Sequence, residues 1–272
     1  MELNIISVLC EGPHDVAFIT KIFKSTGFKS NETLKIDQFP SPINQLILTE
    51  IAKTDVKNLN IQELRYSIIP SATLQKESTY LFLYSLGGDT KTEARQKFLG
   101  DLLALVPKEG EISIAPDANL GVLYFFDSDN KGVAIRVEEL NVEIQKVVGK
   151  KPFKNHLETH LVDGLKIGCL IFTNDDNNFG KLEDILIPLM KTQNDSIFED
   201  AETYLRKHFS EERSKKNYDS KKSTIGIVGQ LQKSGSSNVV CIGQTDYINN
   251  EKIDANQKCV EIIKYFNTYL ES

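Results

Sequence analysis

Two aspartates, one residue apart, follow an apolar strand-forming run in the stretch GVLYFFDSDNKG, residues 121–132. Residues 122–126 are typical of a strand buried on both faces, and Asp127 and Asp129 come directly after them. Ligands bind at the carboxyl ends of strands in open α/β sheets. Two partly desolvated carboxylates repel each other, and a divalent cation relieves that repulsion. The pair therefore predicts an Mg²⁺ or Mn²⁺ site, although aspartate, serine and asparagine are also ordinary turn residues.

A second polar group follows the first predicted strand, residues 4–10. Its sequence is EGPHD, with Glu11 at the end of the strand and Gly12 and Pro13 forming a turn. Asp15 is placed to cap the helix that follows, residues 16–26. If the two strands are neighbours in a parallel sheet, Glu11 and Asp127 lie side by side at the same edge.

A third acidic group, TNDDNNFGKLEDIL, covers residues 173–186 and follows the fourth predicted strand. It contains Asp175, Asp176, Glu183 and Asp184. Acidic residues in a first helical turn commonly just complement the helix dipole, which is the plainer interpretation of Glu183 and Asp184. Their place after a strand nevertheless puts them at the edge expected for Glu11 and Asp127.

These groups depend on a regular alternation of strands and helices. Apolar runs predict strands at residues 4–10, 80–86, 121–126 and 165–173, each followed by an amphipathic helix. The alternation predicts an α/β fold in which a parallel four-stranded sheet is flanked by helices. Residues 1–190 form the expected domain, with an insertion at about 29–78, and residues 191–272 form a mainly helical C-terminal extension.

Composition indicates an ordinary globular protein, because 40% of the 272 residues are hydrophobic and 26% are charged. No apolar run approaches the roughly 20 residues that span a bilayer, so no membrane association is expected. The N-terminus resembles a strand and not a signal peptide. The four cysteines form no CxxC pair, which favours a reducing, cytoplasmic location.

Charge is unevenly distributed along the chain. The formal net charge of −6 argues against a general nucleic-acid-binding protein. Residues 206–222 nevertheless carry seven cations, and they form either a solvated helical face or a patch that contacts phosphates. Lys222 is the candidate to stabilise charge that develops during a reaction. The chain lacks the GxxxxGK[ST], GxGxxG, GxSxG and HExxH motifs.

The glutamate that ends the first strand, in an EGxxD setting, and the later DxD motif together resemble the TOPRIM domain. This domain occurs in topoisomerases, primases and overcoming-lysogenization-defect nucleases. The resemblance is carried by Glu11, Gly12, Asp15, Asp127 and Asp129. The NFGKLEDIL run is also similar to small stand-alone TOPRIM proteins. The resemblance covers residues 1–28 and 79–190, and the long gap between the motifs departs from the usual pattern.

The resemblance implies an Mg²⁺- or Mn²⁺-dependent nuclease that acts on DNA or RNA. Asp127 and Asp129 would hold the metal together with Asp15, and Glu11 would serve in acid–base chemistry or metal binding. Glu183 and Asp184 would complete a second metal site. The resemblance further suggests a separate ATPase partner and a role in phage defence, and it leaves a homo-oligomer open.

Two other classes of function remain open from the sequence. An apolar strand that ends in DxD also fits a haloacid-dehalogenase-like phosphatase, with Asp127 as the nucleophile and Asp129 as the acid. That family places the motif early in the chain, whereas here the strand is the third one. A non-catalytic binding or regulatory module of TOPRIM-like shape is the other alternative, and the net acidity favours it. Nucleotidyl transfer, as in primases, is open too.

Overall fold

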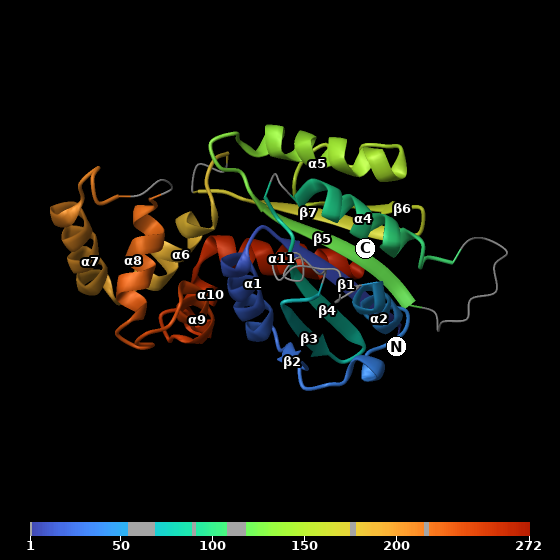
Figure 1. The fold of residues 1–272 in the computed structure, drawn as a ribbon, viewed down its shortest axis with the longest axis horizontal. Helices are drawn as coiled ribbons and strands as arrows, with labels where there is room; N and C mark the ends of the chain where they lie inside the picture. Colours follow the sequence, from blue (N-terminus) through green and yellow to red (C-terminus); the bar gives the residue numbers. More distant parts are fainter. Residues whose placement is uncertain (1, 54–68, 89–90, 108–117, 175–177, 215–217) are drawn as a thin grey trace.

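A mixed β-sheet between two layers of helices forms the centre of the molecule (Figure 1). The computed structural model describes residues 2–53, 69–88, 91–107, 118–174, 178–214 and 218–272. Within these residues the sheet has seven strands in the order β2-β3-β4-β1-β5-β7-β6. Their bounds are β1 Leu3–Cys10, β2 Lys29–Ser30, β3 Ala72–Lys76, β4 Thr79–Ser85, β5 Ala118–Asp127, β6 Glu158–Val162 and β7 Leu165–Phe172.

The four strands expected from the sequence are the adjacent, mutually parallel strands β4, β1, β5 and β7. The expectation of a four-stranded sheet was wrong in its size, because antiparallel strands extend both edges. At one edge, β2 and β3 come from the stretch expected to be an insertion. At the other edge, β6 pairs with β7 through a hairpin whose turn residues, Asp163 and Gly164, both have positive φ. An Asp-Gly pair is a strong hairpin signal, so β6 could have been predicted from the sequence.

Helices cover both faces of the sheet. Buried residues of α2, α4 and α5 pack on one face, while those of α1 and α11 pack on the other, in a core cluster that also includes buried residues of α6 to α10. The helices are α1 Pro13–Ser25, α2 Ile43–Lys53, α4 Thr92–Leu103, α5 Val133–Val148, α6 Leu182–Lys191, α7 Asp195–His208, α8 Ser220–Gly229, α9 Asn238–Gln244, α10 Asn250–Ala255 and α11 Gln257–Glu271, with a short 3₁₀ helix at Ile36–Gln38.

The helices that follow residue 190 belong to the same hydrophobic core as the sheet. The last helix, α11, runs along the sheet (Figure 1), and the Tyr269 hydroxyl donates a hydrogen bond to the Lys166 carbonyl of β7 at 3.0 Å. Phe198 of α7 and Phe266 of α11 are buried in one cluster with strand residues. The boundary at residue 190 therefore stays a prediction.

All four cysteines are buried and free. No described helix combines the length and the apolar character needed to cross a membrane.

Candidate active site

Glu11 is held where the first strand leaves the sheet. Pairing between β1 and β4 continues past the strand ends, because the Leu86 amide donates to the Cys10 carbonyl and the Gly87 amide to the Glu11 carbonyl, at 3.0 and 3.1 Å. A β-carbon on Gly87 would lie 1.8 Å from the Cα of Glu11. Only glycine therefore allows this close approach between the ends of β4 and β1. The parallel pairing of β1 with β5 places Glu11 beside the end of β5.

A cavity of about 340 Å³ opens at the carboxyl ends of these strands. It is lined by the residues after β1, the end of β5 and the first turns of α6 and α8. Five of the seven predicted site residues line it, and they come from four separate segments: Glu11, Asp15, Asp127, Glu183 and Lys222. Strand ends that are far apart in sequence therefore meet, as the parallel arrangement predicted.

Asp15 is a buried carboxylate and Asp127 is a partly buried one, and each accepts a hydrogen bond from a backbone amide. Asp15 accepts a hydrogen bond from the Gly12 amide at 2.7 Å, and Asp127 accepts one from the Leu182 amide at 2.8 Å. Burial raises the pKa of Asp15 to about 7, and the nearby charge of Glu11 contributes to the rise. Burial, then the charges of Asp15 and Glu11, raise the pKa of Asp127 well above its ordinary value. Both groups would be stabilised as anions by a cation in the cavity.

Arg136 joins Glu11 to Asp127. Its guanidinium pairs with the Glu11 carboxylate, and its Nε donates to the Asp127 carbonyl at 3.0 Å. The same Glu11 oxygen accepts a hydrogen bond from the Asp127 amide at 3.2 Å. The sequence patterns did not point to Arg136. A signal was present, however, because a cation in the first turn of α5, with no acidic residue there, opposes the helix dipole and implies a specific partner.

Glu183 is almost fully buried, with 2% of its surface exposed, yet it is matched by two basic groups. His14 Nδ1 and Lys222 Nζ lie 3.7 and 3.5 Å from its Oε1 atom. Burial raises the pKa of Glu183, but the hydrogen bond from His14 and the charge of Lys222 outweigh it and leave the pKa lowered. His14 was not among the predicted site residues. Its place in EGPHD, at the same strand end as Glu11, was the available signal.

The other two predicted ligands, Asp129 and Asp184, lie outside the residues that line the cavity. Asp129 is exposed, adopts a φ of 48° and exchanges two backbone hydrogen bonds with Gly180. Asp184 accepts a hydrogen bond from the Lys181 amide at 2.9 Å and pairs with Lys221. The structure thus gives them turn and helix-capping contacts, and their role as ligands stays a prediction.

Some of the charged residues noted in the sequence lie outside the described part of the chain: Asp175, Asp176, Lys215 and Lys216.

Asp127 and Asp15 could hold an Mg²⁺ or Mn²⁺ ion if water supplied most of its ligands. Among the described residues, no three histidine, cysteine, aspartate or glutamate side chains are grouped so that they could enclose a metal ion. Mg²⁺ usually keeps several waters and binds through one or two carboxylates plus substrate phosphates. The carboxylates of Asp127 and Asp15 would suit that mode of binding and do not suit a closed protein cage.

Residues 6–270 match the model of a family described as "Protein of unknown function (DUF3226)". The chain belongs to the DUF3226 family. The DUF3226 match includes the sheet, the cavity and the C-terminal helices together. No curated protein and no solved structure matches the chain significantly.

Proposed function

We propose that this protein is a metal-dependent nuclease, a phosphodiesterase that cleaves DNA or RNA at a TOPRIM-like centre. One observation carries the proposal: Glu11, Asp127 and Glu183, from separate strand ends and helix starts, line one cavity together with Asp15 and Lys222. Protein cations already face Glu11 and Glu183, so Asp15 and Asp127, whose pKa values are raised, are the carboxylates that a bound cation would stabilise. They lie where α/β sheets bind ligands.

Each side chain has a part that follows from its contacts. A bound Mg²⁺ or Mn²⁺ would neutralise phosphate charge and lower the pKa of an attacking water. Asp127 and Asp15 would hold the metal. Glu11, oriented by Arg136, would accept the proton of the attacking water. Lys222 lies 3.5 Å from Glu183 with its side chain half exposed, so it can reach a phosphate oxygen that enters from solvent.

A cytoplasmic location is proposed from the absence of a CxxC pair among the four cysteines. Control by a separate ATPase partner and a role in phage defence are proposed on the TOPRIM resemblance alone.

The first prediction is that cleavage of nucleic acid needs both metal and Asp127. Single-stranded DNA, duplex DNA and RNA would be incubated with the protein in Mg²⁺, Mn²⁺ or EDTA. We expect Asp127→Asn to lower the cleavage rate by about 100-fold or more, because the neutral amide keeps the shape of the side chain but loses the metal-binding charge. The matched control is Asp163→Asn. Asp163 is exposed and precedes β7, so it lies at the end of the sheet away from the cavity, and asparagine tolerates its positive φ.

Other outcomes would favour the other classes of function. If no substrate is cut in either metal but p-nitrophenyl phosphate is hydrolysed, the haloacid-dehalogenase-like interpretation replaces the nuclease. If neither reaction occurs while Mg²⁺ binds to the wild type and not to Asp127→Asn, the protein is a metal-binding regulatory module.

A further inference from the structure

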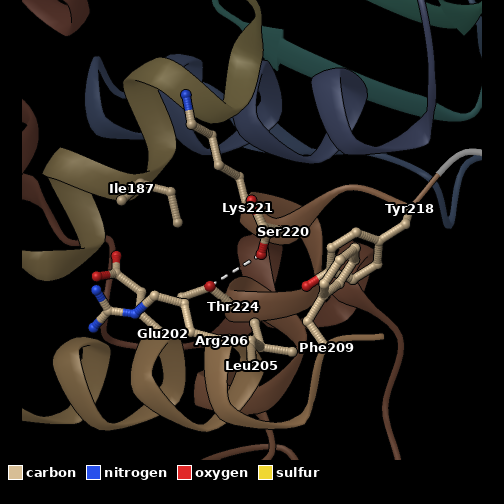
Figure 2. Close-up of a pocket in the computed structure, with 9 residues that line it drawn as sticks. All are labelled: Ile187, Glu202, Leu205, Arg206, Phe209, Tyr218, Ser220, Lys221 and Thr224. Carbon is tan, nitrogen blue, oxygen red and sulfur yellow. Dashed lines mark hydrogen bonds between the residues drawn. The ribbon is translucent and has the colours of Figure 1, made fainter. Parts of the chain in front are cut away.

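A second and larger pocket, of about 540 Å³, lies between α6, α7 and α8 (Figure 2). Figure 1 shows these three helices together at one end of the molecule. The pocket is lined by nine residues of mixed character: Ile187, Glu202, Leu205, Arg206, Phe209, Tyr218, Ser220, Lys221 and Thr224. Its volume is within the range of small-molecule sites, which runs from about 300 to 1,000 Å³.

The pocket presents two aromatic rings to solvent. Phe209, at the end of α7, is 52% exposed, and Tyr218, just before α8, is 41% exposed. Their ring centroids are 5.3 Å apart, and Figure 2 shows the two rings together on one side of the pocket. Exposed aromatic rings in a hollow offer a stacking surface for another planar ring.

The opposite side of the pocket is polar and charged. Glu202 and Arg206 of α7 lie there (Figure 2), and Lys207 follows them on the exposed surface of the same helix. Arginine suits a phosphate, and a carboxylate can accept a hydrogen bond from the amino group of a base. Aromatic, cationic and hydrogen-bonding groups thus meet in one pocket, which is the combination that recognises a nucleotide.

The pocket and the proposed active site are both lined by residues of α6 and α8. Lys221 lines the pocket, while the next residue, Lys222, lines the acidic cavity. On α6, Ile187 lines the pocket and Glu183 lines the cavity, about 6 Å apart along the helix axis. A strand whose phosphate enters the cavity can therefore place a neighbouring base in the pocket.

We propose that the pocket between α6, α7 and α8 binds a base of a single-stranded nucleic acid, next to the phosphate that is cleaved. This inference rests on the proposed function and adds its substrate class. A base in a duplex is stacked and paired, so it cannot enter such a pocket without being extruded. Single-stranded substrate is consequently preferred over duplex.

The test is binding of fluorescently labelled oligonucleotides in EDTA, measured by anisotropy, so that no cleavage occurs. The probes are a single strand of mixed sequence, an abasic strand of the same length and the corresponding duplex. We expect the double variant Phe209→Ala/Tyr218→Ala to bind the single strand about tenfold or more weakly and the abasic strand unchanged. Tyr204→Ala is the matched control, because Tyr204 is an exposed α7 aromatic outside the pocket. Phe209→Leu keeps an apolar side chain but removes the ring, so it should also weaken binding. Because this change is milder, weaker binding by Phe209→Leu would not be explained by a folding defect.

The inference is overturned if the double variant binds the single strand like the wild type, if it loses affinity equally for the abasic strand, or if the wild type binds duplex as tightly as single strand. It is also overturned if the wild type binds no single strand. The cleavage assay with Asp127→Asn tests the proposed function independently. Cleavage without the expected binding results would indicate a nuclease that lacks a base pocket, whereas no cleavage would indicate that the protein is not a nuclease.

Discussion

Asp15 has two roles, because it accepts a hydrogen bond from the Gly12 amide at the start of α1 and also lines the acidic cavity. The helix begins at Pro13, three residues before the predicted start, because proline is well tolerated in a first helical turn. Asp15 therefore caps the helix from within its first turn. Its burial and the nearby charge of Glu11 raise its pKa, and a cation bound in the cavity would offset both effects.

The second testable prediction concerns the pH dependence that follows from this burial. Burial raises the pKa of Asp15 from 3.8 to about 7. Between those values the folded chain keeps a proton that the unfolded chain has lost, so the free energy of unfolding falls as the pH rises from about 4 to 7. Asp15→Asn removes this titration and keeps an acceptor for the Gly12 amide. The free energy of unfolding of Asp15→Asn minus that of the wild type should therefore increase by about 2–3 kcal/mol between pH 5 and pH 8.

Urea denaturation in EDTA at the two pH values measures the difference, with the exposed Asp163→Asn as the control. An Asp15→Asn effect of the same size at both pH values would show that the carboxyl group does not titrate in this range. Adding Mg²⁺ at pH 8 should stabilise the wild type more than Asp15→Asn, because the cation offsets the repulsion that the variant lacks.

At the scale of elements, α11 lies directly on the sheet because two strands carry glycine beneath it. A β-carbon on Gly121 of β5 would lie 2.0 Å from the Tyr269 hydroxyl, and one on Gly168 of β7 would lie 2.4 Å from the Tyr265 hydroxyl. Both tyrosines are buried, and each donates a hydrogen bond to a strand carbonyl. The glycines thus fix how closely the last helix packs against the strands that carry the site.

The third prediction is that Gly168→Ala destabilises the protein by about 1–3 kcal/mol, because the added methyl group overpacks the interface between β7 and α11. Gly100→Ala is the matched control. Gly100 lies inside α4, where the nearest atom to an added β-carbon is 3.9 Å away, so alanine should stabilise the helix by about 0.5–1 kcal/mol. Chemical denaturation measures both, and equal effects of the two changes would contradict the packing argument.

At the scale of the whole molecule, the C-terminal helices share one core with the sheet. The rings of Phe23 in α1 and Phe266 in α11 have centroids 4.3 Å apart, and Ile225 and Ile242 are buried in the same cluster as Val8. The family match also continues to residue 270. The part after residue 190 therefore supplies core residues in addition to one wall of the acidic cavity.

The fourth prediction is that a chain cut after residue 190 does not fold cooperatively, since removing the C-terminal helices exposes the apolar face beneath α11. Near-ultraviolet circular dichroism and urea titration of residues 1–190, beside the full chain, would test this. A native-like spectrum with a sharp unfolding transition would instead show that residues 1–190 form an independent domain.

Short-range patterns were enough to predict the four parallel strands, the helices between them and the carboxylates at their ends. An apolar run such as residues 122–126, and a turn such as EGPHD, are determined by neighbouring residues. The hairpin at Asp163 and Gly164 was equally local and could have been predicted, which would have enlarged the sheet by one strand.

The tertiary structure alone decided which of these groups meet. Strand order and the packing of α5, α6 and α8 bring Arg136 to Glu11, and His14 and Lys222 to Glu183, while Asp129 is left outside the cavity lining. Ion pairing and pKa depend on distance and burial among residues that are far apart in sequence, and no local pattern contains those quantities. The sequence by itself therefore determined that acidic groups lie at strand ends, and the three-dimensional packing decided which of them form a site.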